Sequence, residues 1–410
     1  MRSHFALVGA LALAVSLPIR AHAQKEVTLY NFTGGADGSH PNGLVFDTSG
    51  NLYGTTFFGG TINDMCLAGC GTVFQLVRSG GGWTLNTLHS FAGNSTDTGH
   101  PVQVIVDSHG NLYGPGETGG GPSDSGGIFE LTRSKGWKES VIYGFTPKTG
   151  NSPAELTLHN GAFYGATAFG PERNGQVGYG TLYELALDHN GQWKHTIIHA
   201  FRGTDGYEPA GNPVFDPQGH IYGSVPFTFT NQAGEIFELE RGKKAWNLRV
   251  IDDVGGGDMI FDKSGNLYFS LGGGGSSNCD GGCGSVVELK KTASGWKQIT
   301  LYEFTDVRDG EDPTDLVFGA DGSLYGTTFL GGTGSCVFFQ FSGCGTVFKL
   351  THGSGGWRKT TLYNFTGGSD GEFPSGAPLV MDASGNLYGA TAGGASFGSS
   401  GFGTIYEIQQ

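Results

Sequence analysis

The sequence predicts an all-β protein, a seven-bladed β-propeller with four-stranded blades. Three observations support this prediction: one phrase recurs seven times, glycine and aromatic residues are both abundant, and the segment missing from the last copy stands at the start of the chain. Of the 410 residues, 76 are glycine, yet 12% are aromatic. Short strands joined by tight turns explain that mixture better than disorder does.

The first 23 residues have the layout of a cleavable secretory signal, with Arg2, an apolar run over residues 5–17, and Ala21-His22-Ala23. We therefore predict a signal peptide over residues 1–23 and a propeller over residues 24–410. The apolar run is short for a membrane span, and no later segment approaches the roughly 20 apolar residues that a span needs. The expected product is secreted or periplasmic, without membrane insertion.

The repeated phrase is D-x-x-G-N-L-Y-G, and its tyrosines lie 46 to 63 residues apart. Within the first copy, residue alternation and glycine-marked turns predict four strands, at residues 44–47, 51–55, 71–76 and 83–91. Loops must absorb the variation in spacing between copies. The seven tyrosines are Tyr53, Tyr113, Tyr164, Tyr222, Tyr268, Tyr325 and Tyr388.

The fourth strand of each copy carries a pair of large side chains. All six tryptophans open this strand, and a phenylalanine follows eight residues later in all but one of these copies. Residues eight apart on a strand share a face, so we expect both side chains to meet the same neighbouring blade. We interpret the pair as a buried wedge between blades, and a stacking platform for sugars is the alternative. The pairs are Trp83/Phe91, Trp137/Phe145, Trp193/Phe201, Trp246/Val254, Trp296/Phe304 and Trp357/Phe365.

The two ends of the chain share one blade in this prediction. Residues 27–32 nearly repeat residues 361–365, whereas the C-terminal copy stops after its third strand. The N-terminal strand is therefore expected to complete the last blade. A ring closed in this way leaves no open sheet edge, unlike a linear solenoid.

The phrase Asn51-Leu52-Tyr53-Gly54-Thr55-Thr56, followed by Gly71-Thr72-Val73-Phe74, resembles the GloVer (Gloeo_Verruco) tandem repeat of exported bacterial proteins. The resemblance recurs at residues 324–328 with 345–348, and at residues 386–391 with 403–406. It extends over essentially the whole mature chain. It implies a repeat architecture and export, and it implies no particular activity.

The six cysteines form three local pairs, each ending directly before the glycine that opens a third strand. In an exported chain, such pairs at equivalent repeat positions predict disulfides. Zinc ligation is the alternative, but no histidine lies nearby. The predicted pairs are Cys66–Cys70, Cys279–Cys283 and Cys336–Cys344.

Charge narrows the possible partners. Loss of Arg2 and Arg20 with the signal leaves 21 basic and 37 acidic residues, a formal charge of −16. Nucleic acid is therefore not expected as a partner, because its phosphates require cationic contacts. We predict a monomer without a cofactor, we assign no metal ligands, and an extracellular glycan or other polymer is the expected ligand.

Candidate site residues lie in the long loops, which the propeller prediction places on one face around the channel mouth. Four of them directly precede the proline that opens a first strand, and a carboxylate accompanies them: His40, His100, Glu208, Asp312 and Glu372. The same loops carry further acids, among them Asp37, Asp205, Asp309 and Asp370, which either form Asp-Gly turns or bind sugar hydroxyls, a cation or a basic peptide. Loop aromatics lie close by, and they either hold a saccharide or pack loop against loop: Phe57, Phe58, Phe227, Phe229, Phe329, Phe338, Phe339 and Phe341.

Three functions follow from these features. The first is a binding propeller for a glycan or other extracellular polymer. The second is a carbohydrate-active hydrolase or lyase in which the histidines and carboxylates at the channel mouth transfer protons. The third is a structural surface protein.

Overall fold

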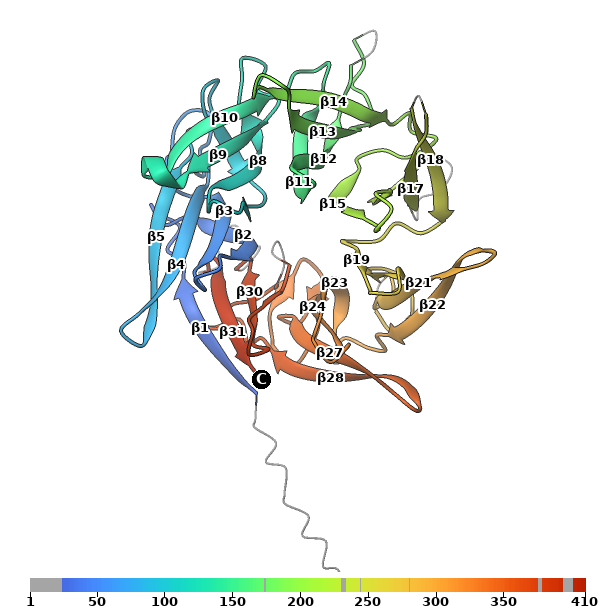
Figure 1. Cartoon of the computed structure of the whole chain (residues 1–410). Coiled ribbons are helices and arrows are strands. Elements are labelled where there is room, and N and C mark those ends of the chain that lie inside the picture. The colour runs from blue at the N-terminus through green and yellow to red at the C-terminus, as the bar shows by residue number, and fades with distance from the viewer. Residues whose placement is uncertain are drawn as a thin grey trace, which may run out of the picture.

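The computed structural model describes residues 24–172, 175–229, 234–243, 245–279, 281–374, 378–393 and 401–410, so the predicted signal peptide lies outside the described residues. Seven antiparallel sheets stand around a central axis (Figure 1), which confirms the seven-bladed propeller. In each blade we name the strands A to D from the axis outward. None of the described segments forms a helix long and apolar enough to cross a membrane.

The first four blades follow the chain. Blade 1 contains β2 (Ser39–Phe46), β3 (Leu52–Phe58), β4 (Thr72–Ser79) and β5 (Gly82–Ser90). Blade 2 contains β6 (Thr98–Pro101) and β7 (Ile105–Val106) as a split strand A, then β8 (Leu112–Gly119), β9 (Gly127–Thr132), the 3-10 turn η1 (Arg133–Lys135) and β10 (Lys138–Gly144). Blade 3 contains β11 (Asn151–His159), β12 (Ala162–Phe169), β13 (Thr181–Leu187) and β14 (Trp193–Ala200). Blade 4 contains β15 (Ala210–Phe215), β16 (Ile221–Val225), β17 (Glu235–Arg241) and β18 (Trp246–Asp252).

The remaining blades complete the ring. Blade 5 contains β19 (Ile260–Phe261), β20 (Leu267–Leu271), β21 (Ser285–Thr292) and β22 (Gly295–Glu303). Blade 6 contains β23 (Glu311–Phe318), β24 (Leu324–Leu330), β27 (Thr346–Gly353) and β28 (Gly356–Asn364), with the small hairpin β25 (Val337–Phe338) and β26 (Phe341–Ser342) in its B–C loop. Blade 7 contains β29 (Val380–Met381), β30 (Leu387–Thr391), β31 (Thr404–Gln409) and β1 (Lys25–Asn31).

The ring closes as the sequence predicts. Strand β1 pairs antiparallel with β31, from Lys25 opposite Gln409 to Asn31 opposite Thr404. In Figure 1 the blue N-terminal strand accordingly lies beside the red C-terminal one. The first strand of the chain thus supplies the outer strand of the last blade, and no blade interface is left open.

The hydrophobic core is divided among the seven blade interfaces. Seven buried clusters are present, and each joins residues of two adjacent blades. The tryptophans lie in these interfaces; Trp137 of blade 2, for example, packs against Tyr53 of blade 1 at 5.9 Å between ring centroids. The predicted place of the tryptophans between blades is therefore confirmed, although their side chains are half-buried rather than buried.

The expected common face of the tryptophan and the phenylalanine is wrong. In blade 2, Trp137 faces blade 1, whereas Phe145 packs into the interface with blade 3 against Tyr183. The reason is a β-bulge between strands C and D, which shifts the register in all seven blades. A bulge inserts one residue and inverts the alternation beyond it. In the five blades that have both residues, the tryptophan of strand D therefore faces the preceding blade and the phenylalanine faces the next.

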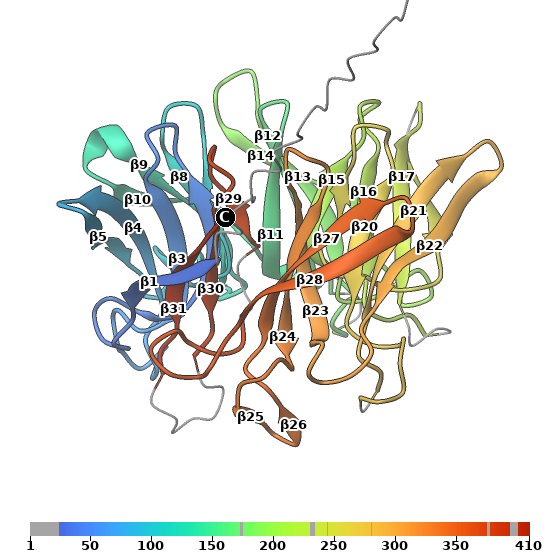
Figure 2. The same cartoon turned by 90° about the horizontal axis from the view of Figure 1, so that it is seen from below.

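The two faces of the ring differ. One face, the turn face, carries the A–B and C–D turns; Asp47, for example, accepts backbone hydrogen bonds from Ser49 and Asn51. The other, the loop face, carries the longer B–C loops and the D–A loops. Figure 2 shows the β25–β26 hairpin projecting from this loop face. Any ligand site built from variable loops must lie on the loop face.

Candidate functional site

The position before the strand A proline has the same backbone conformation in six blades. Its φ angle lies between 51° and 57°, although none of the six residues is glycine: His40, His100, Ser152, Glu208, Asp312 and Phe373. This left-handed conformation costs about 1 to 2 kcal/mol for an L-residue, so other contacts must compensate for it.

A clasp between neighbouring blades provides that compensation. The N–H of the residue before proline donates to the carbonyl group directly before the glycine of strand C in the preceding blade; His100 donates to Cys70 at 2.7 Å. The proline ring then covers that glycine, and a Cβ on Gly71 would lie 2.6 Å from Pro101 Cδ. The clasp fixes the backbone at this position and leaves the identity of the side chain free.

The structure brings two of the five candidate residues together. The imidazoles of His40 and His100 lie 5.3 and 5.7 Å from the ring of Phe58, and His100 also packs on Phe57 at 5.0 Å. Nδ1 of His100 lies 3.0 Å from the hydroxyl of Thr118. Burial lowers the pKa of both histidines, so both are neutral at pH 7.

The three acidic candidates lie at separate places around the ring. Glu208 and Asp312 occupy the clasp position of blades 4 and 6. Glu372 precedes the clasp residue of blade 7, and its carboxylate lies within 4.8 Å of the sulfur atoms of Cys336 and Cys344. Burial raises the pKa of Asp312, and burial together with Asp370 raises the pKa of Glu372.

The aspartates of the D–A loops accept hydrogen bonds from their own loop and from the strand D before it. Asp370 accepts hydrogen bonds from the Tyr363 hydroxyl at 2.9 Å and from the Thr366 N–H at 2.8 Å. Asp37, Asp205 and Asp309 make equivalent contacts to a strand D side chain and to the backbone. These contacts support the turn-forming interpretation over a ligand-binding one.

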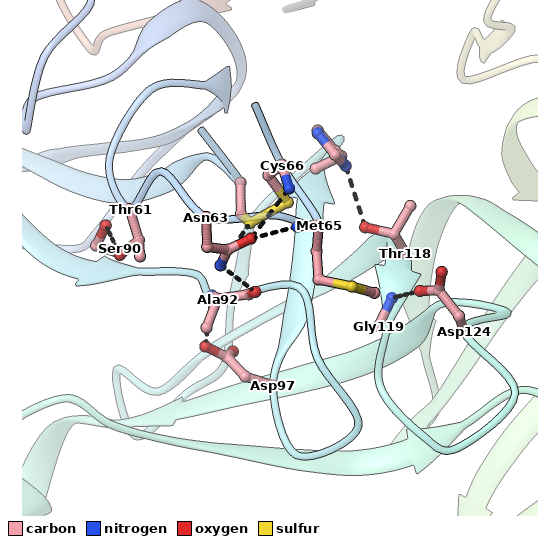
Figure 3. Close-up of a disulfide and its surroundings, with 12 residues drawn as sticks. Thr61, Asn63, Met65, Cys66, Ser90, Ala92, Asp97, Thr118, Gly119 and Asp124 are labelled. Atoms are coloured by element: carbon pink, nitrogen blue, oxygen red, sulfur yellow. Dashed lines mark hydrogen bonds between the residues drawn. A yellow bond between two sulfur atoms is a disulfide. The ribbon is translucent and has the colours of Figure 1, made fainter. Parts of the chain in front are cut away.

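The predicted disulfides are confirmed, and they reinforce three of the clasps. Cys66–Cys70, Cys279–Cys283 and Cys336–Cys344 are bonded, so none of these thiols is free to ligate zinc. The second cysteine of each pair supplies the carbonyl of the clasp. In Figure 3 the Asn63 carboxamide orders the first loop, accepting from the Met65 and Cys66 N–H groups and donating to the Ala92 carbonyl.

The sequence analysis missed a row of carboxyl groups in the central channel. Glu155, Asp258 and Asp315, which we call the channel carboxyls, line a cavity of about 330 Å³ together with Glu117 and Ser224. The carboxyl group of Asp258 interacts electrostatically with those of Glu155 and Asp315. It also accepts the Asn212 N–H at 3.1 Å.

Bulges in strand A place two of the channel carboxyls, Glu155 and Asp315. In blade 3 two residues, Ala154 and Glu155, stand opposite the single residue Ala166 between paired positions. Blade 6 repeats this irregularity at Asp315. Bulges re-aim side chains near functional sites, and here they turn Glu155 and Asp315 into the channel. The sequence signal is an acid directly before the buried Leu156, Met259 and Leu316.

Carboxyl groups this close cannot all be ionised. Burial, together with the neighbouring Asp258, raises the pKa of Asp315 to about 8. Burial also raises the pKa of Glu155, and Asp258 adds to this effect. The row therefore retains protons at neutral pH and contains carboxylic acids able to donate them.

Exposed apolar side chains gather on the loop face. Of the large apolar side chains that are exposed in the described part of the chain, all but Leu158, Leu187 and Val250 belong to B–C loops or their edges. Phe339 is 87% exposed and Phe229 is 60% exposed. The exposed aromatics are Phe169, Tyr179, Phe227, Phe229, Phe339 and Phe402.

Some loop aromatics form a connected patch, and others pack internally. Phe229 contacts Tyr179 at 5.1 Å and Tyr207 at 5.8 Å, and Tyr207 stacks on Phe227 at 5.5 Å. We call these four residues the aromatic patch. In blade 6, by contrast, Phe329 and Phe338 pack against Phe373 of blade 7. The loop-packing interpretation is thus confirmed for the blade 6 loop, whereas the saccharide interpretation stays a prediction.

Comparison with known proteins identifies a repeat family and the fold. Residues 19–237, more than half of the chain, match the Gloeobacter/Verrucomicrobia repeat. No curated protein sequence matches. The extracellular domain of a one-component system from B. thetaiotaomicron is similar over 94% of this chain at 11% identity and a TM-score of 0.56, and this chain spans 42% of that one.

Two further solved structures show the same kind of similarity. A hypothetical selenium-binding protein from Sulfolobus tokodaii matches 77% of this chain and 76% of its own at 13% identity, with a TM-score of 0.51. A gluconolactonase from Xanthomonas campestris matches 75% of this chain and 87% of its own at 16% identity, with a TM-score of 0.43. At such identities the similarity concerns the fold alone.

Proposed function

This chain belongs to the Gloeobacter/Verrucomicrobia repeat family, and from that premise we propose that it binds an extracellular glycan or a similar polymer through its loop face. The concentration of exposed aromatic side chains on this one face supports the proposal. Exposed apolar groups that gather on one face mark an interaction site, whereas single exposed residues need no explanation.

The aromatic patch is the proposed centre of binding. Its rings offer flat apolar surfaces for the C–H faces of sugars, and the Tyr179 and Tyr207 hydroxyls can bond to sugar hydroxyls. The formal charge of −14 disfavours a polyanion, so the expected ligand is neutral. His40, His100, Glu208, Asp312 and Glu372 are proposed as further ligand contacts around the channel mouth.

The location proposed for this binding is outside the cytoplasm. The three disulfides fit such a location. We propose that residues 1–23 direct export and that the product is a secreted or periplasmic monomer. Neither nucleic acid nor membrane insertion forms part of the proposed function.

A second candidate is cleavage of the bound polymer by a hydrolase or lyase. The observation that favours it is the row of channel carboxyls, because a carboxylic acid that keeps its proton at pH 7 suits general acid catalysis. These acids replace the mouth histidines as the proposed proton donors, since burial keeps His40 and His100 neutral. Turnover abolished by Asp258→Asn, with binding retained, would support this candidate.

Binding can be tested on a glycan array with the purified mature protein. We expect the double variant Tyr179→Ala/Phe229→Ala to weaken binding roughly 30-fold, because loss of a central aromatic contact costs about 2 kcal/mol. The control variant, Leu187→Ala/Val250→Ala, removes exposed apolar side chains outside the aromatic patch and should bind as the wild type does. Absence of binding to every neutral glycan, or equal loss in both variants, would overturn the proposal.

A further inference from the structure

A histidine and two carboxylates converge between blades 1 and 2, away from the channel. His89 comes from β5, Asp97 from the D–A loop and Glu139 from β10, and one ligand atom of each lies within 4.8 Å of the other two. We call these three residues the interface site. Nε2 of His89 lies 3.3 Å from each oxygen of Asp97, which is longer than the 2.7–2.9 Å of a charged hydrogen bond.

The repeat provides an internal comparison for the interface site. Between blades 5 and 6 the equivalent positions hold Tyr302, Asp309 and Lys359. There the Lys359 side chain is 2% exposed, and its ammonium group donates to Asp309 at 2.8 Å. A cation therefore occupies this place in one copy of the repeat. Between blades 1 and 2, Glu139 stands at the position of the lysine, so the interface site has an additional carboxylate and no lysine ammonium.

No lysine or arginine pairs with the acids of the interface site among the described residues, although Asp97 faces His89 and accepts the Ala92 N–H at 2.8 Å, as a turn-forming aspartate does. Oε1 of Glu139 is buried there without a hydrogen bond. A buried carboxylate beside a second one needs a proton or a metal ion. Asp216, His220 and Glu238 differ in this respect, because Lys291 and Arg249 pair with the two acids.

We propose that the interface site binds a divalent transition-metal ion of the zinc class. One imidazole and two carboxylates are ligands that Zn²⁺ accepts, and three protein ligands leave a fourth position for water. Two ligands bonded at 2.0–2.1 Å in a tetrahedron lie about 3.3 Å apart, which is the spacing of His89 Nε2 and the Asp97 oxygens. Such an ion would tie the D–A loop after blade 1 to the outer strand of blade 2.

Zinc titration of the chelator-treated protein by calorimetry tests this proposal. We expect one tight Zn²⁺ equivalent, which also raises the melting temperature. The variant Glu139→Gln keeps the shape of the side chain and removes one anionic ligand. It should weaken binding more than tenfold, because even the outer-shell partners of metal ligands are worth about 10- to 100-fold. His89→Gln should weaken zinc binding by the same factor. It tests the proposal independently if Glu139→Gln folds poorly.

The repeat also provides matched controls. Between blades 3 and 4, His199 and Asp205 lie 3.0 Å apart, but Leu248 stands at the position equivalent to Glu139. His199→Gln should therefore bind zinc as the wild type does, whereas Leu248→Glu should create a second zinc equivalent. The proposal is overturned if the wild type binds no zinc at millimolar concentration, or if Glu139→Gln and His89→Gln both bind as tightly as the wild type.

Discussion

Replacing one channel carboxyl should change how stability depends on pH. Asp315 has its pKa raised from 3.8 to about 8 by burial and by Asp258. Because the folded state holds this proton more tightly, the contribution of Asp315 to the free energy of unfolding is fully present below pH 4 and is lost as the pH rises through 8. At 1.36 kcal/mol per pKa unit the full loss would be about 6 kcal/mol. Because the effective dielectric constant of proteins is about 20 even at buried sites, we expect a smaller loss of ~2 kcal/mol.

The variant Asp315→Asn removes this ionisation and keeps a similar shape. Urea unfolding followed by tryptophan fluorescence, in chelator at pH 5, 6, 7 and 8, should show the variant gaining stability over the wild type as the pH rises. The control Asp321→Asn lies in the same blade, but its carboxylate is 55% exposed and pairs with Lys349. It should move the curve by less than ~1 kcal/mol at every pH. Equal pH slopes for the wild type and Asp315→Asn would refute the channel electrostatics.

Three further predictions concern the clasp and the wedges. Gly71→Ala should lower the free energy of unfolding in urea by at least ~2 kcal/mol, because φ is +88° and the new Cβ would meet Pro101. The control Gly50→Ala has φ +80° with open space around it and should lose only about 1 kcal/mol. Equal losses in the two variants would mean that the clasp contributes nothing to stability. Replacing Cys66 and Cys70 together with serine should lower stability by about 2 kcal/mol and leave the far-ultraviolet circular dichroism unchanged, since this disulfide closes a short loop. Trp193→Ala should lower stability by ~2–4 kcal/mol in thermal unfolding, because the ring packs between blades 2 and 3; a change below 1 kcal/mol would contradict the wedge.

The fold was predictable because every copy repeats the same local signals. The tyrosine phrase locates strand B, the glycine before Thr72 locates strand C, and the matching ends of the chain locate the closure. Each signal is short-range, and repetition makes it readable without an alignment. The disulfides were predictable for the same reason, since each cysteine pair takes the same place before strand C.

The site was less predictable because bulges decide where side chains point. Period-2 alternation assumes a regular strand, and the bulge in strand D places Trp137 and Phe145 on opposite faces. In strand A, the bulge at Glu155 turns a carboxylate into the channel. No residue type marks either bulge in a single sequence. The pattern therefore predicted a site at the residue before proline and did not predict the channel carboxyls.

The clasp explains how a repeat can vary its chemistry without losing its shape. A backbone hydrogen bond and a proline on glycine hold each interface, and neither depends on the side chain before the proline. That position can therefore hold histidine, glutamate, aspartate or phenylalanine. The strand D position of the interface site varies in the same way, with lysine in blade 6, glutamate in blade 2 and leucine in blade 4. Ligand-binding groups can thus arise in one blade at a time, which is why the zinc-class site is proposed for a single interface of the seven.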